Sequence, residues 1–444
     1  MFVLLSETNV VDQHSFNDNM FIKDKKVLSL FSGAGGMDLG FEGGFEVLSR
    51  SINQVINDDW QTEEIDNQWS LLEPTKFKTV FANDILKPAQ LAWQNYFKKH
   101  DIDVNNYKLD SIVDLVKEYR EDGIDHFPKN IDIITGGFPC QDFSIAGRRG
   151  GLNSHKSHDN NNINSSTPNV ENRGQLYIWM RQVIEIVKPK VFIAENVKGL
   201  VNLGDVKEVI ENDFRSIGNN GYLVVPARVL HAANFGVPQS RERVFFIGFR
   251  RDALTEEALT ELSREIINEQ FDPYPIETHF LPDEMVTVLD ERKKFVSVKE
   301  ALANLKEPDQ TDDLAQQSYS KAKFYGRHCQ GQIEVDLDGI APTIRAEHHG
   351  NIEFRRLSKV NGGQYIDELN NGLQERRLTV RECARIQTFP DDYEFVWPKD
   401  KKRERLSASA AYRIIGNAVP PLLAYHIAKR LERNWTLYFG ENSK

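Results

Sequence analysis

Short apolar runs alternate with helix-like segments through the first half of this chain, and this alternation constrains its fold more than any other feature. Segments with the helical spacing of apolar residues lie at 89–97 and 175–187. Strands separated by helices favour a mostly parallel sheet with helices on both faces. We therefore expect a doubly wound α/β fold here. The strand-like runs are residues 26–31, 79–82, 131–135, 190–194, 222–225 and 244–248.

Beyond about residue 252 the alternation stops. Residues 254–270 form an acidic stretch that we expect to be helical, and a mixed region with scattered prolines and glycines follows. Two capping-box patterns, Ser297 to Glu300 and Thr379 to Glu382, each predict the start of a helix. The chain of 444 residues has room for a second, smaller domain, and we expect that domain to be irregular.

Two polar stretches interrupt the pattern of the first half. Residues 49–74 are expected to be an insertion between the first two strand–helix units. Residues 153–172 are rich in Asn, Ser and His and have no apolar period, which is typical of a long loop. Because this loop closely follows the strand at 131–135, it is a candidate lid over a site there.

Cysteine usage indicates a reducing compartment. The three cysteines are Cys140, Cys329 and Cys383, too few for a disulfide framework, and none has the CxxC or Cys/His spacing of a zinc site. We expect Cys383 to be core packing. The chain shows neither a signal peptide nor an apolar run of about 18 residues, so we expect a cytoplasmic protein without a membrane segment.

The net charge of −11, from 55 basic and 66 acidic residues, argues against a protein whose whole surface binds nucleic acid. A basic face could still be assembled from local clusters. Taken singly, such a cluster is usually a solvated face and gives no evidence of binding. The clusters lie at residues 148–149, 241–243, 250–251, 355–356, 376–377 and 399–405.

Cys140 follows a predicted strand that ends in two glycines, so the thiol would stand on a loop with rigid backing. A thiolate in such a place is a strong nucleophile, although most free cysteines are small buried hydrophobes. Glu195 follows the strand at 190–194, and Arg241 and Arg243 occupy alternate positions before the strand at 244–248. A nucleophile, a carboxyl group and cations thus meet at one sheet edge, as an active site requires.

The first strand leads into a glycine-rich turn, residues 32–36, and then into a helix. Such a turn lets the backbone approach a ligand closely. It matches neither the GxGxxG fingerprint nor the P-loop, which disfavours a nicotinamide cofactor or a nucleoside triphosphate. Asp84 ends the second strand, where an acidic residue typically holds a ribose. The two features together indicate an adenosine-type cofactor.

Six blocks in order resemble the motifs of the bacterial restriction–modification DNA (cytosine-5) methyltransferase family, and the resemblance covers nearly the whole chain. The glycine-rich turn resembles the family's S-adenosylmethionine motif, and the segment around Cys140 resembles its nucleophile motif. The blocks are residues 31–36, 137–144, 195–197, 239–243, 377–382 and 416–420. The resemblance implies a Rossmann-like S-adenosylmethionine-dependent catalytic domain and a smaller target-recognition domain.

The resemblance also implies a reaction. A cytosine is flipped out of duplex DNA, and the Cys140 thiolate attacks its carbon 6. Glu195 contacts ring nitrogen 3 and the exocyclic amine, while Arg243 holds the carbonyl oxygen, with Arg241 counted in the same catalytic set. Carbon 5 then receives a methyl group from S-adenosylmethionine. No metal is implied.

Further residues are carried over by position in the matching blocks. Asp84 would bind the ribose hydroxyls and Ile85 would pack on the adenine, while Ser144, Gln239 and Arg241 would support the catalytic loop. The cofactor set is Phe31, Gly33, Gly35, Asp84, Ile85, Asp110, Pro139, Leu176 and Asn417. The DNA-binding set is Gln141, Ser144, Arg148, Gln239 and Arg345, the last within the variable region that should read bases in the major groove.

On this reading residues 1–251 are the catalytic and cofactor-binding domain, 252–371 the target-recognition domain, and 372–444 a C-terminal segment with a helix returning to the catalytic domain. The partners implied are double-stranded DNA and a cognate restriction endonuclease acting on the same site without direct contact, and we expect a monomer. The strongest alternative is a transfer-RNA methyltransferase of the same architecture. A non-catalytic DNA-binding relative is disfavoured because Cys140, Glu195 and Arg243 are all present, and a Cys-dependent hydrolase because no partner histidine follows a strand in a comparable position. The long region 252–371 favours DNA over RNA.

Overall fold

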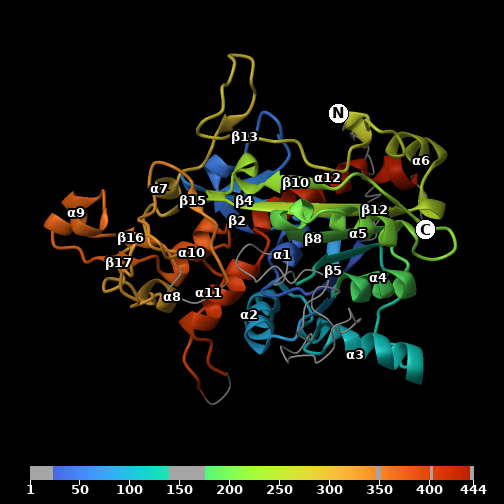
Figure 1. The fold of residues 1–444 in the computed structure, drawn as a ribbon, viewed down its shortest axis with the longest axis horizontal. Helices are drawn as coiled ribbons and strands as arrows, with labels where there is room; N and C mark the ends of the chain where they lie inside the picture. The colour runs from blue at the N-terminus through green and yellow to red at the C-terminus, as the bar shows by residue number, and fades with distance from the viewer. Residues whose placement is uncertain (1–23, 140–175, 347–351, 401–403, 441–444) are drawn as a thin grey trace, which may run out of the picture.

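An eight-stranded sheet forms the centre of the protein in a computed structural model, which describes residues 24–139, 176–346, 352–400 and 404–440 (Figure 1). The strands run in the order β10-β12-β8-β7-β1-β5-β6, and β9 pairs with the end of β12 on the edge opposite β8. Their bounds are β1 Lys25–Leu30, β5 Phe77–Asn83, β6 Tyr107–Lys108, β7 Ile133–Gly137, β8 Val191–Val197, β9 Tyr222–Val224, β10 Arg228–His231 and β12 Glu242–Arg250.

The strand directions confirm the predicted mostly parallel sheet. β8, β7, β1, β5 and β6 are parallel to one another, whereas β12 runs antiparallel to β8 and pairs antiparallel with β9 and β10. All six strand-like runs of the sequence are strands. β6 and β10 were not predicted, because one has only two residues and the other has one fully buried side chain. The parallel strands place their carboxyl ends at one edge.

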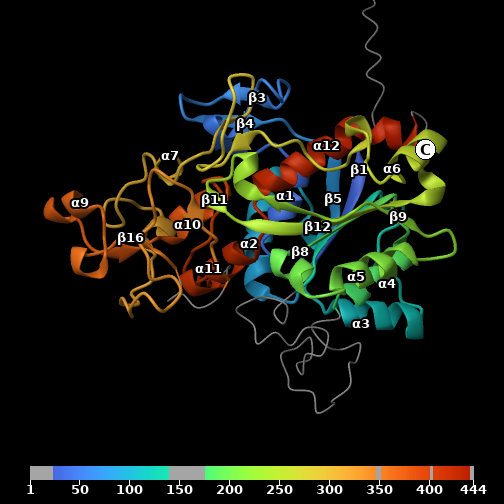
Figure 2. The same ribbon diagram turned by 45° about the horizontal axis from the view of Figure 1, so that its top comes forward.

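Helices cover both faces of the sheet (Figures 1 and 2). Successive strand residues face opposite sides, so Ile133 of β7 belongs to one hydrophobic core and Ile134 to the other. The first core contains side chains of α1 (Gly36–Glu42), α2 (Lys87–Phe97) and α12 (Pro421–Phe439). The second contains side chains of α3 (Ile112–Lys117), α4 (Leu176–Val187) and α5 (Val206–Arg215).

The C-terminal helix α12 packs directly on α1, although nearly 400 residues separate them. A methyl group on Gly40 of α1 would lie 2.4 Å from Cβ of Ala424, so the glycine permits this close approach. Pro421 occupies the first turn of α12, where its missing N–H costs nothing. The C-terminal segment therefore closes one face of the sheet next to the turn that follows β1.

The polar stretch 49–74 is more ordered than the sequence indicated. It contributes to a three-stranded antiparallel sheet of β2 (Glu46–Leu48), β4 (Trp69–Leu72) and β3 (Gln61–Glu64). Trp60 and Leu72 are buried in the main core, which anchors the insertion. The predicted loop at 153–172 lies outside the described residues.

Residues 263–417, between α6 and α12, are built from short elements, as expected, and most of them lie at the left of Figures 1 and 2. The prediction of a helix over residues 254–270 is wrong beyond Leu262, where α6 (Glu256–Leu262) ends. Ile266 is 86% exposed, so no packing against the core stabilises a longer helix there. Both capping boxes are confirmed, at α7 (Val298–Ala301) and α10 (Val380–Ile386). The remaining elements are β11 Gln239–Ser240, β13 His279–Phe280, β14 Lys293–Lys294, α8 Leu314–Gln317, β15 Ala341–Pro342, β16 Phe354–Arg356, α9 Ile366–Asn370, β17 Arg376–Arg377 and α11 Ala408–Asn417.

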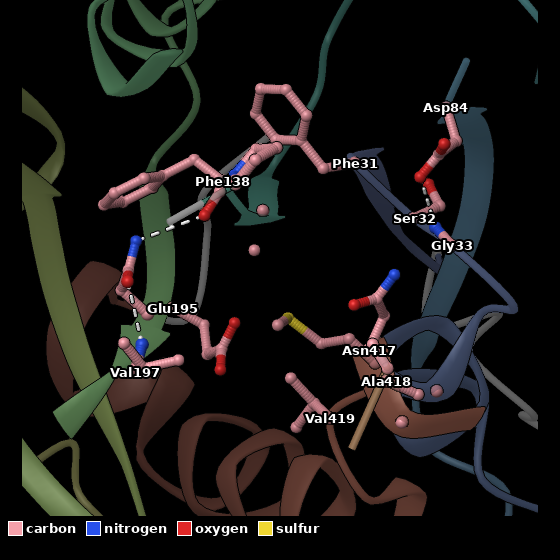
Figure 3. A pocket seen from close by; sticks show the side chains of 18 of the residues that line it. Phe31, Ser32, Gly33, Asp84, Phe138, Glu195, Val197, Asn417, Ala418 and Val419 are labelled. Atoms are coloured by element: carbon pink, nitrogen blue, oxygen red, sulfur yellow. Dashed lines mark hydrogen bonds between the residues drawn. The ribbon is translucent and has the colours of Figure 1, made fainter. Parts of the chain in front are cut away.

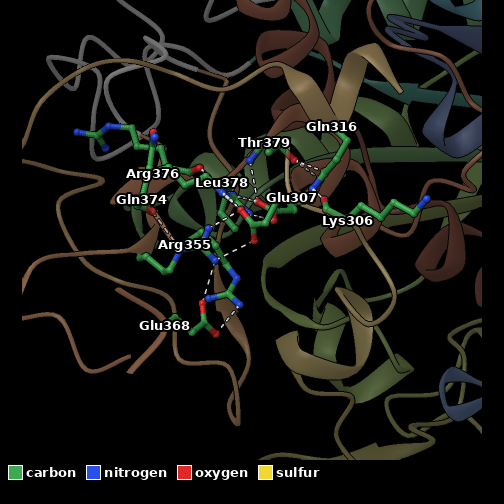
Figure 4. Close-up of polar contacts among 12 residues, drawn as sticks. Lys306, Glu307, Gln316, Arg355, Glu368, Gln374, Arg376, Leu378 and Thr379 are labelled. Atoms are coloured by element: carbon green, nitrogen blue, oxygen red, sulfur yellow. Dashed lines mark hydrogen bonds and ion pairs between the residues drawn. The ribbon is translucent and has the colours of Figure 1, made fainter. Parts of the chain in front are cut away.

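Two of the basic clusters, at residues 355–356 and 376–377, have a structural role. Arg356 and Arg376 are buried and share Glu307 in a network of ion pairs (Figure 4). Arg377 is buried beside them and donates to backbone carbonyls. A buried cation needs partners, and here carboxylates and carbonyls supply them. Among the described residues no helix is long and apolar enough to cross a membrane.

Candidate active site

A cavity of about 1450 Å³ opens at the carboxyl ends of the parallel strands. Its wall contains residues after β1, β5, β7 and β8, together with parts of α4, α11 and the segment after β15 (Figure 3). In open α/β sheets the ligand binds at this edge. Most of the residues nominated from the sequence meet here.

The glycine-rich turn forms one side of the cavity. Gly33 has a φ of +55°, and a methyl group there would meet nothing within 4 Å, so the backbone faces open space. Phe31 lines the cavity and is held at a φ of +53°, which is unusual for a residue with a side chain. Gly35 lies behind the wall, where a methyl group would collide with Trp93 at 2.5 Å. Gly35 thus shapes the turn instead of lining the cavity.

Asp84 stands at the end of β5 and is tied to the glycine-rich turn. Its Oδ2 accepts a hydrogen bond from the Gly33 N–H at 3.0 Å, and its Oδ1 accepts one from the Leu86 N–H at 2.8 Å. Burial raises the pKa of Asp84, and these hydrogen bonds oppose the shift. The neighbouring Ile85 is 51% exposed on the cavity wall.

These residues fit an adenosine-type cofactor. Each carboxyl oxygen of Asp84 can accept a further hydrogen bond in addition to the one it already receives, as ribose hydroxyls would require. Phe31 and Ile85 offer apolar surface on the same wall, and Gly33 leaves room for close approach. Leu176, the first residue of α4, and Asn417, the last of α11, also line the cavity. Asp110 is exposed outside the wall, and its carbonyl accepts from Asn83.

The residues that follow β7 lie on the cavity wall. Phe138 and Pro139 line the wall, and the carbonyl of Phe138 accepts a hydrogen bond from Nδ2 of Asn196 at 3.1 Å (Figure 3). Asn196 is buried, so this bond fixes the end of β7 against β8. Cys140, Gln141, Ser144 and Arg148 follow and lie outside the described residues.

Glu195 and Arg243 form an ion pair on the wall opposite the glycine-rich turn. Nε of Arg243 lies 2.8 Å from Oε1 of Glu195, and both side chains are at least 87% buried, with 13% and 10% of their surface exposed. Phe245 pairs directly with Glu195 across β12 and β8, and Arg243 lies two residues away on the same face. Burial raises the pKa of Glu195, which Arg243 opposes. The carboxyl group points into the cavity (Figure 3).

Three other nominated residues lie in the wall or behind it. Arg241 and Gln239 are completely buried, outside the cavity lining, and bond to backbone and side-chain groups. In this conformation Gln239 is not available to DNA. Arg345 does line the cavity, although its Nη1 is buried without a hydrogen-bond partner.

Two useful residues were missed from the sequence. Asn196 has a recognisable signal, because asparagine is depleted in strands and a buried one demands hydrogen bonds. Arg413 lies on the cavity wall within electrostatic range of Asp84. It precedes Asn417 by four residues on α11, a spacing that places both on one helix face.

Comparisons with known proteins agree with this geometry. The family model of the C-5 cytosine-specific DNA methylase matches residues 25–433. The chain is 31% identical over 425 residues to Type II methyltransferase M.FnuDI of Fusobacterium nucleatum, covering 93% of this chain and 95% of that protein. It is 30% identical over 441 residues to Type II methyltransferase M.BspRI of Lysinibacillus sphaericus, covering 96% and 86%.

Solved structures support the fold. The S. pombe Dnmt2 methyltransferase aligns with a TM-score of 0.51 and 17% identity over 92% of this chain and 99% of its own. The Entamoeba histolytica methyltransferase EhMeth aligns with a TM-score of 0.52 and 16% identity over 92% and 98%. The family model spans nearly every described element, including the strand ends that build the cavity. This chain therefore belongs to the C-5 cytosine-specific DNA methylase family.

Proposed function

We propose that this chain methylates carbon 5 of a cytosine flipped out of duplex DNA, with Cys140 as the nucleophile and S-adenosylmethionine as the methyl donor. One observation carries the proposal: the paired side chains of Glu195 and Arg243 share a cavity with a cradle suited to adenosine. The peptide bond after Pro139 leads from that wall directly to Cys140. A cytosine ring cannot be reached while it is stacked, so base flipping precedes the chemistry.

In the proposed reaction, Cys140, Glu195 and Arg243 act on different atoms of the cytosine ring. The Cys140 thiolate forms a bond to carbon 6 of the ring, which moves electrons toward nitrogen 3 and carbon 5. Burial raises the pKa of Glu195 and thus favours a protonated carboxyl group, which can donate to nitrogen 3. Arg243 donates hydrogen bonds to the carbonyl oxygen of the ring and pairs with the Glu195 carboxyl group at the same time. After carbon 5 has been methylated, its proton is lost to water and nitrogen 3 returns its proton to Glu195, while the carbon 6–sulfur bond breaks and releases Cys140 as the thiolate.

S-adenosylmethionine, when bound, supplies an electrophilic methyl group that the activated carbon 5 takes up. We assign its ribose to Asp84, its adenine to Phe31 and Ile85, and its remaining contacts to Gly33, Pro139, Leu176 and Asn417. Gly35 shapes the turn from behind. Arg413 joins this set because it lines the cavity and interacts electrostatically with Asp84. We leave Asp110 out of this set, because it lies outside the cavity lining and its carbonyl bonds to Asn83.

On the DNA side we assign contacts to Gln141, Ser144 and Arg148, which follow Cys140 in the sequence, and to Arg345 in the recognition region at 252–371. Gln239 and Arg241 act behind the wall as supports. The relatives' names, Type II methyltransferases, support a role in restriction–modification, in which methylation protects host DNA from a cognate endonuclease. We propose that the enzyme acts on double-stranded DNA as a monomer in the cytoplasm.

The test is transfer of tritiated methyl from S-adenosylmethionine to unmethylated duplex DNA, with transfer RNA in parallel and bisulfite sequencing of the product. We expect cytosine methylation within one short duplex motif. The Cys140→Ser variant should lose transfer while retaining cofactor binding. Turnover by that variant would refute the mechanism, and transfer to RNA alone would refute the DNA substrate.

A further inference from the structure

Two segments of the cavity wall that are far apart in sequence touch each other directly. We call residues 343–346 the DNA-side segment and residues 416–419 the cofactor-side turn, after the roles of Arg345 and Asn417 in the proposed function, on which this inference rests. A methyl group on Gly416 would lie 2.3 Å from the carbonyl carbon of Arg345. The backbones of the two segments are thus in contact.

Arg241 makes a first polar connection between them. Its Nη1 donates to the carbonyl of Ile344 at 3.1 Å, and its Nη2 donates to the carbonyl of Gly416 at 2.9 Å. The side chain is completely buried. A guanidinium is a rigid planar fork, so its two arms hold the two carbonyls at a fixed separation.

Gln239 and Gln387 make a second connection. The N–H of Ile344 donates to Oε1 of Gln239 at 3.0 Å, and Nε2 of Gln239 donates to Oε1 of Gln387 at 2.5 Å. Nε2 of Gln387 then donates to the carbonyl of Ala418 at 2.6 Å. Both glutamines are completely buried. The N–H and the carbonyl of Ile344 are therefore each linked to a carbonyl that flanks Asn417.

These bonds make the two segments mechanically dependent. Arg345 follows Ile344 directly, and Asn417 lies between Gly416 and Ala418. If contact with DNA shifts the Ile344 peptide, buried donors and acceptors lose their partners unless the cofactor-side turn moves with it. Because unpaired buried polar groups are costly, joint movement is favoured over separate movement.

We propose that the two connections couple DNA binding to cofactor binding, so that each ligand raises the affinity of the enzyme for the other. Gln239, Arg241 and Gln387 are positioning residues in this scheme. Gln387 is the most informative of them, because its side chain bonds only to Gln239 and Ala418 among the described residues. Coupling of this kind is reciprocal, and it typically amounts to about 5- to 150-fold in affinity.

The experiment measures the dissociation constant of S-adenosylhomocysteine, the demethylated cofactor, with and without a duplex that carries the site identified by bisulfite sequencing. We expect the duplex to tighten binding by at least about fivefold in the wild type. In Gln387→Met, which keeps the Arg241 connection, the ratio should fall by about twofold or more relative to the wild type. Gln316→Met is the matched control, since Gln316 is a buried glutamine bonded to Thr379 and Lys306 outside both connections, and it should keep the wild-type ratio.

A ratio of one in the wild type, or an unchanged ratio in folded Gln387→Met, would overturn the proposal. If Gln387→Met fails to fold by circular dichroism, Arg241→Lys takes its place, because one ammonium group cannot reproduce the fork. The DNA dissociation constant measured with and without S-adenosylhomocysteine must change by the same factor. Failure of the proposed function is distinct: wild-type enzyme would then not methylate DNA, or Asn417→Ala would leave cofactor affinity unchanged.

Discussion

A methyl group on Gly137 would lie 2.8 Å from Oε2 of Glu195. The two residues pair directly across β7 and β8, so the bare glycine leaves the space that the carboxyl group occupies. Gly137 stands three residues before Cys140, which means that one strand end both leads to the nucleophile and makes room for its partner. Shape and chemistry are thus linked at this point of the sheet.

Gly137→Ala should reduce kcat by about 10²-fold, because a displacement of about 1 Å near the reacting atoms can cost that much. The added methyl group would push the Glu195 carboxyl away from its place beside Arg243. Steady-state methyl transfer measures the effect. Gly339→Ala is the control, since its methyl group would meet the carboxylate of exposed Asp336 at 2.6 Å, in the second half of the chain. Equal activity losses in both variants would contradict this role of Gly137.

Glu195→Gln should lower kcat by about 10²-fold or more, the usual size of a general-acid contribution, with little change in the KM for DNA. The amide keeps the shape of the carboxyl group but cannot give up a proton. Burial raises the pKa of Glu195, so the neutral, donating form persists to higher pH than for an exposed glutamate. As pH rises through that pKa the donor is lost, and wild-type kcat should fall.

The pH profile of the single-turnover rate constant for methyl transfer tests whether Glu195 is the group that titrates. The alkaline fall should be present in the wild type and absent from Glu195→Gln, whose amide does not titrate. An identical fall in both proteins would assign that titration to another group.

Much of the cavity was predictable because its parts are local. Each long parallel strand contains an apolar run, and because these strands point the same way, the residues that follow their runs lie at one sheet edge, as Asp84 and Glu195 do. The same reasoning predicts that Phe31 and Gly33, which follow β1, line the cavity. The family motifs added the chemistry that these positions serve.

The remaining features depend on partners far away in the sequence. Arg241 looked like a catalytic arginine beside Arg243, but the structure buries it against carbonyls 103 and 175 residues away. The sequence around Arg356 and Arg376 resembles a charged surface segment, but both side chains are buried and form ion pairs with Glu307. No local pattern marks Gln387, whose importance arises only when three distant segments meet.

Asp84→Asn should weaken S-adenosylhomocysteine binding by about tenfold, equivalent to about 1.4 kcal/mol. The carboxyl oxygens of Asp84 accept from the Gly33 and Leu86 N–H groups. An asparagine would turn an NH₂ group toward one of these donors, and an unpaired buried donor costs about 1–3 kcal/mol. Isothermal titration calorimetry measures the change.

DNA affinity in the absence of cofactor should stay unchanged in the same variant, because Asp84 lies on the cofactor side of the cavity. Asp103→Asn is a suitable control, since Asp103 also accepts a backbone N–H, that of Asn105, but is exposed. Unaltered S-adenosylhomocysteine binding in Asp84→Asn would contradict the assignment of the cofactor's ribose to Asp84.

Glu307→Ala should destabilise the second half of the chain by about 3 kcal/mol, the lower range for breaking a buried ion pair. Its Oε2 lies 2.5 Å from Nη2 of Arg356 and 3.1 Å from Nε of Arg376, and both arginines are nearly inaccessible (Figure 4). Burial opposes ionisation of Glu307, but the hydrogen bonds from Arg356 and Arg376 outweigh it and lower its pKa from 4.5 to about 2. Thermal melting at neutral pH should show the loss as a lower Tm.

The pH dependence of that loss follows from the sign of the shift. A carboxyl group with a depressed pKa stabilises the folded state above its unfolded pKa, and this stabilisation is lost as pH falls toward the folded pKa. The difference in Tm between wild type and Glu307→Ala should therefore be full above pH 4.5 and shrink between pH 4.5 and about 2. Glu185→Ala, which removes an exposed pair with Arg120, should change stability by less than about 1 kcal/mol. A Tm difference for Glu307→Ala that is undiminished at pH 2.5 would show that packing, and not the ionised carboxylate, holds Arg356 and Arg376 in place.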